Sequence, residues 1–340
     1  MVDYAEQISG LGSDGYLRLQ KESVYGTGVT NAMKDIKILP ETLVKVTNNI
    51  IETLNQVNSR IKQDPNTAGR IAIEGSIEMD VDPTNLGYIL DVALDQKAVT
   101  GTADTGYLHA FLAPYTGSNI PNSMTVQQAL GGNLVDQFNG CTITGFELSS
   151  DTEKNEKMIY SLVGQTHTAD VARVTSFTFG AVQPFSFGQT TITVTFTGLT
   201  AYTLKCNSFT FKSEFGYDTE RYKLGSQSIL QSVFKAIASG ELSVNVDADA
   251  TLLEYARAQT PCSILITTTH SVLAGAVSGA YSYIIEIPEA RIKPETEVKN
   301  SNERLTQDIV FDIYGGTTTN SGTDVVAYEI RVKDAVASYA

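Results

Sequence analysis

The sequence predicts a mainly β protein with short helices, a β-rich α+β fold, in which two related β-sandwich or barrel domains follow one another. Three observations support this prediction. Apolar and polar residues alternate with period two over several segments. One strand-and-helix pattern occurs twice, about 165 positions apart. The composition is also polar without being strongly charged, which suits β domains with large uncharged surfaces.

Composition supports the β prediction. The 340 residues are 42% hydrophobic and only 18% charged, with 16 Tyr, 13 Phe and 27 Gly but no Trp. Aromatic and β-branched residues are enriched in strands, and glycine is common in the turns between them. A chain of this length is also long enough for two domains of ordinary size.

The repeated pattern consists of a strand followed by a short helix. The first occurrence is Gly75–Asp82 with Leu86–Gln96, and the second is Gly240–Asp247 with Leu252–Gln259. Short acidic segments, Asp82–Thr84 in the first and Asp247–Asp249 in the second, precede the helices and suit helix N-termini. We therefore expect two domains, residues 1–170 and 171–340, with the junction inside the Phe- and Thr-rich stretch 175–200.

The alternation assigns a face to each residue of the repeated strand. The first strand alternates Ile71, Ile73, Ile77, Met79 and Val81 with Glu74, Ser76, Glu78, Asp80 and Asp82. The second alternates Leu242, Val244 and Val246 with Glu241, Ser243, Asn245 and Asp247. We expect the apolar sets to be buried and the polar sets to face outward.

Other elements are predicted in the same order in both halves. Tyr16–Gly26 is matched loosely with Phe209–Gly216, and apolar strands are expected at Tyr107–Pro114 and Ser263–Thr269. Long hairpins are expected at Cys141–Gln165 and Tyr281–Gly315, with charged tips at Asp151–Lys157 and Lys293–Glu303. Residues 38–69 are expected to form a long arm, either helix or loop: Ile50, Leu54, Val57 and Ile61 fit helical spacing, whereas Leu43–Thr47 could be extended. Gly315–Asp324 has the composition of a flexible linker, and Val325–Val332 that of a final strand.

The net charge, the spacing of the cysteines and the lack of long apolar runs argue against several classes of function. A net charge of −14 without a basic stripe argues against a protein that grips nucleic-acid phosphates. Cys141, Cys206 and Cys262 are widely separated, which predicts buried thiols in a reducing cytoplasm. The first residues do not resemble a signal peptide, and no apolar run is long enough to span a bilayer.

No motif predicts an enzyme or a cofactor. The glycines Gly10, Gly12 and Gly15 match a dinucleotide-binding pattern, but no apolar strand precedes them and no helix pattern follows. The three histidines His109, His167 and His270 are too sparse for a metal cluster. The pairs Asp80/Asp82 and Asp247/Asp249 have calcium-loop spacing but lack the loop glycine, so helix capping is the preferred interpretation. We expect no catalytic, cofactor or metal site.

Several segments resemble the tail tube (major tail) proteins of siphoviruses, long-tailed bacteriophages. They are Gly75–Leu90, Leu108–Phe111, Gly140–Ser149, Glu22–Gly28 followed by Ile38–Pro40, and Phe209–Gly216 with the last hairpin. The resemblance implies a virion protein that self-assembles into rings whose inner strands form one barrel around a lumen. Two domains per chain imply three chains per pseudo-sixfold ring, with six chains as the alternative. It also implies the tail terminator, tail tip and tape measure proteins as partners, assembly in the host cytoplasm, and no membrane.

The resemblance gives hypothetical roles to two sets of residues. An acidic lumen that conducts DNA without binding it would be lined by Glu74, Glu78, Asp80, Glu241 and Asp247. Contacts between stacked rings would come from the arm and the hairpin tips, with Ile50, Leu54, Arg60, Lys154, Lys157, Glu295 and Lys299 as candidates. A phage receptor-binding or adhesin-type β-sandwich is the alternative function.

Overall fold

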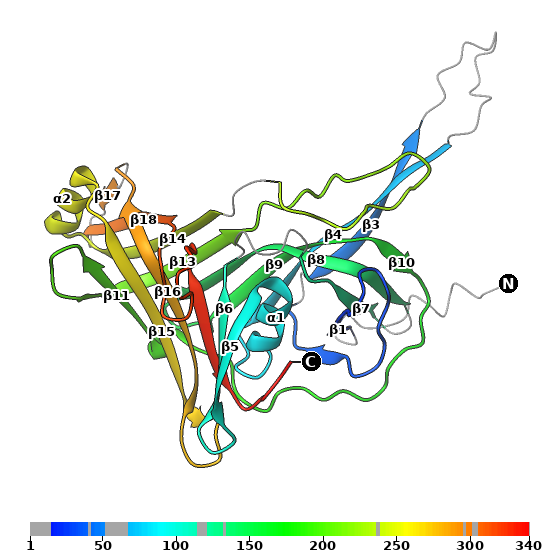
Figure 1. Cartoon of the computed structure of the whole chain (residues 1–340), viewed down its shortest axis with the longest axis horizontal. Coiled ribbons are helices and arrows are strands. Elements are labelled where there is room, and N and C mark those ends of the chain that lie inside the picture. Colours follow the sequence, from blue (N-terminus) through cyan, green and yellow to red (C-terminus); the bar gives the residue numbers. More distant parts are fainter. Residues whose placement is uncertain are drawn as a thin grey trace, which may run out of the picture.

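The computed structural model describes residues 15–39, 42–51, 67–113, 121–131, 134–235, 239–294, 297–300 and 305–339. It is mostly β, with strands joined in a large antiparallel sheet system and two short α-helices (Figure 1). This confirms the predicted β-rich fold. No helix in the described ranges is long and apolar enough to cross a membrane.

Eight strands of the described chain form one antiparallel sheet that crosses both halves of the sequence. In spatial order they are β3 (Leu43–Ile51), β4 (Thr67–Asp80), β9 (Lys157–Gly164), β8 (Leu134–Asp151), β13 (Cys206–Glu214), β14 (Ser239–Asp247), β18 (Leu305–Tyr314) and β17 (Glu297–Asn300). We call this the eight-stranded sheet. The pair β8–β13 is its joint between the two halves of the chain.

A second antiparallel layer also draws on both halves. Its order is β12 (Tyr202–Leu204), β11 (Thr190–Phe196), β15 (Cys262–Leu273), β16 (Ala280–Ile292), β19 (Glu329–Asp334), β6 (Gly106–Leu112) and β5 (Asp95–Thr102). The last residues of β16 leave this layer and pair with β18. Apolar side chains from both layers form one buried cluster, for example where Phe211 of β13 meets Tyr328 edge-on.

A smaller group of strands continues from the N-terminal part of β8. It comprises β2 (Lys34–Ile36), β1 (Tyr16–Lys21), β7 (Met124–Leu130) and β10 (Thr166–Thr168). A 3-10 turn, Phe187–Gln189, precedes β11. Because β8 belongs to this group and to the eight-stranded sheet, the first half of the chain is fixed to both.

The repeated strand-and-helix pattern folds as predicted. Helix α1 (Leu86–Ala93) follows β4, and helix α2 (Ala250–Ala258) follows β14. The side chain of Asp249 caps α2 by accepting a hydrogen bond of 2.8 Å from the Thr251 amide. In the first half Asp82 has this role one turn earlier, since its carboxylate accepts from the Thr84 amide at 2.8 Å. Asp82 is therefore buried, and the prediction that it faces outward was wrong because the chain turns at the strand end.

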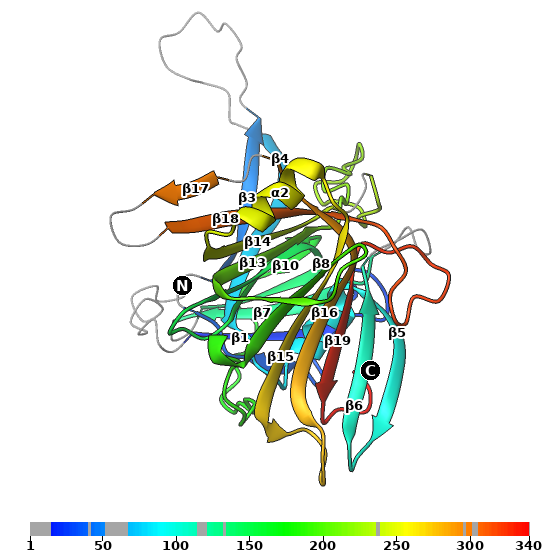
Figure 2. The same cartoon turned by 90° about the vertical axis from the view of Figure 1, so that its left-hand side faces the viewer.

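The arm begins as strand, which settles the alternative for its described part. Residues 43–51 are extended in β3, and β4 begins at Thr67. The helical alternative was therefore wrong at Ile50, which lies in β3. Leu54, Val57 and Ile61 lie outside the described residues. The end of β3 and the start of β4 project from one end of the molecule, and the turns of the β5–β6 and β15–β16 hairpins lie at the other (Figures 1 and 2).

These two hairpin turns, one from each half, are hydrogen-bonded together. The Ala276 amide donates to the Ala103 carbonyl at 2.9 Å, and the Val277 amide donates to the Asp104 carbonyl at 3.0 Å. With the strand pairs β8–β13 and β6–β19, they connect the two parts of the chain. The division into domains 1–170 and 171–340 stays a prediction.

Three other sequence predictions need correction. Strand β13 pairs with β14 as β3 pairs with β4, so its counterpart is β3 and not the β1 segment. Residues 297–300 of the expected charged tip form β17 beside β18. The expected linker at Gly315–Asp324 is held in place, because the Thr318 amide donates to Ser321 Oγ at 2.9 Å and the Asn320 amide to Glu329 at 2.9 Å.

The final strand and the thiols follow the predictions only in part. Strand β19 covers Glu329–Asp334, a few residues later than expected. Cys141 and Cys262 are buried, but Cys206 is only partly buried. Burial raises the pKa of all three thiols, that of Cys206 to about 12, so they are protonated packing groups.

Candidate functional site: the acidic face of the eight-stranded sheet

One face of the eight-stranded sheet packs on the core, and the opposite face carries the charged side chains. Alternation is clear in the C-terminal part of β8, where Phe146 and Leu148 are buried whereas Glu147 and Ser149 are not. The same holds for Leu242 and Val244 of β14 against their polar neighbours. We call the outward side the acidic face.

Strand register aligns the charged positions across the sheet. Directly paired residues of neighbouring strands project to the same side. One such row crosses six strands through Glu78, Ile159, Glu147, Lys212, Glu241 and Asp312. The next rows add Asp80 beside Lys157, Gly145 beside Glu214, and Asn245 beside Asp308.

The five acidic residues expected from the sequence all lie on this face. Glu74 and Asp247 are exposed, and Glu78, Asp80 and Glu241 are partly exposed. The structure adds five carboxylates that the sequence analysis missed: Glu147, Asp151, Glu214, Asp308 and Asp312. Their strands show the same alternation, so the signal was present. What the sequence did not show was that these strands are neighbours in one sheet.

Lysines compensate part of this charge. Lys157 Nζ lies 2.8 Å from Glu78, Lys212 Nζ lies 2.9 Å from Glu214, and Lys293 contacts both Glu241 and Asp312. Hydrogen bonding to the partner carboxylate raises the pKa of Lys212 and of Lys293, so both stay charged. The ten carboxylates of the acidic face outnumber the lysines among them, and the face keeps a negative field.

The candidate ring-contact residues occupy three different places. Lys154 is exposed in the β8–β9 turn and pairs with Asp151 at 2.8 Å. Lys157 is the first residue of β9, on the acidic face. Ile50 and Lys299 lie in β3 and β17, which are the two outer strands of the eight-stranded sheet. Leu54, Arg60 and Glu295 lie outside the described residues.

A segment of the second half supports the base of the arm. Beyond the end of β9, the Ile71 amide of β4 donates to the Gln227 carbonyl at 2.9 Å, and the Tyr222 hydroxyl donates to the Ile71 carbonyl at 3.2 Å. The Arg70 guanidinium lies 5.3 Å from the centre of the Tyr222 ring. The start of β4 is therefore held by contacts from both halves of the chain.

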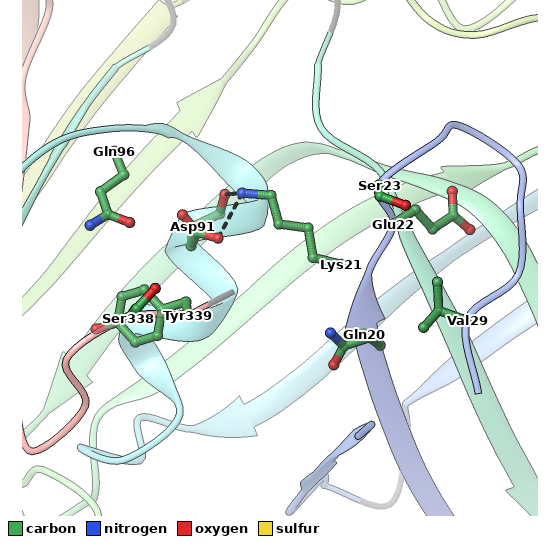
Figure 3. Close-up of a pocket in the computed structure, with 9 residues that line it drawn as sticks. All are labelled: Gln20, Lys21, Glu22, Ser23, Val29, Asp91, Gln96, Ser338 and Tyr339. Carbon is green, nitrogen blue, oxygen red and sulfur yellow. Dashed lines mark hydrogen bonds and ion pairs between the residues drawn. The ribbon is translucent and has the colours of Figure 1, made fainter. Parts of the chain in front are cut away.

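A cavity away from the acidic face lies between β1, α1 and the C-terminal segment (Figure 3). Its main charged groups satisfy each other, because Lys21 Nζ donates to Asp91 Oδ2 at 2.7 Å. At its rim, the Glu22 carboxylate accepts four hydrogen bonds, from the amides of Gly26 and Gly140 and the hydroxyls of Ser123 and Thr125. Glu22 thereby fixes the Glu22–Gly28 loop, so a structural role accounts for these side chains.

The candidate calcium pairs and the histidines are engaged in structural contacts. Asp82 and Asp249 accept hydrogen bonds at helix starts, as described above. His109 is fully buried and its Nε2 lies 2.7 Å from the Val336 carbonyl. Within the described ranges, no three His, Cys, Asp or Glu side chains converge as metal ligands do.

Comparison with known proteins agrees with a structural role. A search of curated proteins gave no match. Comparison with protein families matches the family described as phage tail tube protein over residues 12–327. The match covers both halves, the arm and every strand of the eight-stranded sheet. The chain therefore belongs to the phage tail tube protein family, a family of structural proteins of the virion tail.

Proposed function

We propose that three copies of this chain close a pseudo-sixfold ring, and that rings stack into the tube of a siphovirus-type tail. The observation that carries the proposal is the eight-stranded sheet, to which each half of the chain gives four strands in the same order. Three chains would supply 3 × 8 = 24 strands to one closed barrel. Closure would also pair the outer strands β3 and β17, which each have one strand partner in the described chain and whose second edges would otherwise promote aggregation.

The acidic face lines the lumen in this proposal. Its carboxylates repel the phosphates of DNA, so the genome passes during ejection without specific binding. Three chains carry a formal charge of 3 × −14 = −42. The compensating lysines sit beside carboxylates, which keeps them from acting as isolated phosphate-binding groups.

The arm and the exposed turns then contact neighbouring rings. The arm leaves one end of the sheet, and its base is braced by the second half of the chain. The chain would assemble in the host cytoplasm and meet tail terminator, tail tip and tape measure proteins in the completed virion. These partners follow from the family and not from any contact described above.

Electron microscopy of the purified protein tests the assembly. We expect tubes whose reconstruction has three chains per ring, with Glu78, Glu147 and Glu241 on the inner wall. Tubes with these carboxylates on the outer wall would refute the lumen assignment. Discrete monomers at high concentration would refute the ring.

A charge reversal tests the function of the lumen. The variant Glu74→Lys with Asp247→Lys changes two exposed residues of the acidic face, and Asp170→Lys with Glu254→Lys is the matched control outside it. We expect the first variant to retain short duplex DNA in sedimented tubes at low salt, with wild type and control retaining several-fold less. Equal DNA retention by both double variants would contradict a lumen position for Glu74 and Asp247.

A further inference from the structure

The joint between the two halves of the chain predicts the joint between neighbouring chains. We propose that β3 of one chain pairs antiparallel with the β16–β17 edge of the next, in the register that places Val44 opposite Ile292. This inference rests on the proposed ring. It adds the strands that meet, their direction and their residue pairs, which follow from strand pairings inside the single chain.

The two halves of the eight-stranded sheet correspond strand by strand. The first half-sheet is β3, β4, β9 and β8, and the second is β13, β14, β18 and the edge formed by the end of β16 with β17. In each, a short helix follows the second strand. The strand after β8 is β13, the first strand of the second half-sheet. By the same order, the strand after the β16–β17 edge is β3 of another chain.

The β16–β17 edge of the second half-sheet can be aligned with β8 of the first, residue by residue. The repeated pattern aligns Ile77 of β4 with Leu242 of β14. Ile77 pairs with Tyr160, which pairs with Phe146 of β8. Leu242 pairs with Phe311, which pairs with Ile292 at the end of β16. Ile292 therefore occupies in the second half-sheet the place of Phe146 in the first.

Strand β3 can be aligned with β13 in the same way. The repeated pattern also aligns Gly75 with Gly240. Gly75 pairs with Val44 of β3, and Gly240 pairs with Ser213 of β13. In the joint within the chain, Ser213 pairs with Phe146. Substituting the corresponding residues puts Val44 opposite Ile292, and both side chains are buried on the core side of the sheet.

Hydrogen-bond directions agree with this register. In the internal joint the Phe215 amide donates to the Thr144 carbonyl at 2.9 Å, so the pair two residues along, Ser213 with Phe146, is also a hydrogen-bonded pair. The Val44 amide correspondingly points away from β4. In the single chain it donates to the side-chain oxygen of Gln128 at 2.9 Å.

Gln128 thus occupies the position that a neighbouring carbonyl takes in the internal joint. Its amide nitrogen is buried and has no hydrogen-bond partner in the described chain. In the ring, the Ile292 carbonyl of the next chain replaces the Gln128 oxygen. The side chain protects a single edge donor until the partner strand arrives, which limits premature pairing of an open edge.

Strand direction also suits this joint. Each chain gives eight antiparallel strands, which is an even number. Strand β3 of one chain therefore runs opposite to the β16–β17 edge of its neighbour, and the strand directions continue to alternate around the ring. The adjacent pair places Arg291 opposite Lys45, and these two cations repel each other unless neighbouring carboxylates balance them. Each has a carboxylate on its other side, since Arg291 pairs with Asp312 and Lys45 pairs with Glu74. The row across the joint is therefore neutral in sum.

Disulfide cross-linking tests the register. Lys45 and Arg291 form a non-hydrogen-bonded pair in the proposed joint, where Cα atoms are about 4.5 Å apart. That spacing allows a disulfide. We expect the double variant Lys45→Cys with Arg291→Cys to give covalent trimers on mild oxidation of assembled protein, and reductant to reverse them. Wild type, with its native cysteines, and each single variant should give no covalent trimer.

A register-shifted variant is the matched control. Lys45→Cys with Glu289→Cys places the thiols about 7–8 Å apart on the diagonal, and it should cross-link at least about fivefold more slowly. Faster cross-linking of this shifted pair in intact rings would overturn the register and leave the ring standing. Covalent hexamers from Lys45→Cys with Arg291→Cys would support the register and overturn the ring of three. Absence of rings in wild type would overturn the proposed function, and the joint with it.

Discussion

Helices α1 and α2 come from the same sequence pattern but end in different environments. All eight residues of α1 are buried, whereas α2 buries only Leu252 and Ala256. The difference is not local. Helix α1 is covered by the C-terminal segment, whereas α2 lies at the edge of the molecule with its polar side exposed to solvent (Figure 1).

The C-terminal segment that covers α1 is held in place by the buried carboxylate of Asp334. The Tyr339 hydroxyl donates to Asp334 Oδ2, and its ring lies 4.3 Å from that of His109. The Val336 amide donates to Asp334 Oδ1 at 2.9 Å. The C-terminal residues therefore complete the first half of the chain, and no described segment has the same place over α2. A repeated sequence pattern specifies the helix, and the covering segment determines how much of it is core.

The largest effect should come from filling the contact between α1 and its cover. A Cβ atom at Gly87 would lie 1.8 Å from the Tyr339 hydroxyl oxygen. We expect Gly87→Val to lower the free energy of unfolding by about 2–3 kcal/mol, because Tyr339 cannot move without losing its Asp334 contact. Leu253→Val at the corresponding, half-buried position of α2 is the control and should cost less than about 1 kcal/mol. Similar losses in denaturant titrations of both variants would remove the distinction between the helices.

A second comparison concerns aligned residues of β18 and the turn before β9. The strand pairings align Gln307 with Glu156, and both are fully buried. The Glu156 carboxylate accepts from Tyr283 at 2.6 Å and from Thr190, but no cation lies among its hydrogen-bond partners in the described chain. Burial raises the pKa of Glu156 from its ordinary 4.5 to about 7.

This raised pKa predicts a pH-dependent stability that Gln307 cannot produce. Below about pH 4.5 Glu156 is protonated in both folded and unfolded chains and costs nothing. As the pH rises to about 7 the unfolded chain releases the proton more easily, so the folded state loses stability. We expect Glu156→Gln to be more stable than wild type by about 1–2 kcal/mol at pH 8, with the gain vanishing near pH 4.5. The exposed Glu153→Gln should show no such trend in parallel denaturation curves. A difference in unfolding free energy between Glu156→Gln and wild type that does not change with pH would contradict this explanation.

The smallest expected effect separates the helix starts. Asp249 caps α2, and its removal in Asp249→Ala should cost about 1 kcal/mol of unfolding free energy. The N-cap residue of α1, Asn85, has no side-chain bond to the helix backbone. Glu254→Ala, on the exposed side of α2, is the control and should change stability by less than about 0.5 kcal/mol. A cost for Asp249→Ala no larger than that of the control would show that the cap contributes nothing.

Much of the candidate site could be predicted from alternation alone. The phase of Ile73, Ile77 and Met79 against Glu74, Glu78 and Asp80 identified the buried and the acidic side of β4, and β14 repeated it. The helices after both strands, the β8–β9 hairpin and the family resemblance also followed from residues close together in sequence. Local propensity and period-two patterning act over a few residues, so a sequence displays them directly.

Which strands are neighbours was decided only by the tertiary structure. The alternation of Tyr16–Lys21 is as regular as that of Leu43–Ile51, yet β3 and not β1 lies beside β4. Glu147 and Glu241 share one row only because β13 lies between β8 and β14. Burial of Asp82, and the capture of Val44 by Gln128, likewise depend on residues far away in the chain. Alternation determines which face a side chain takes, whereas pairing is selected by the packing and hydrogen bonds of the whole sheet, to which distant segments contribute equally.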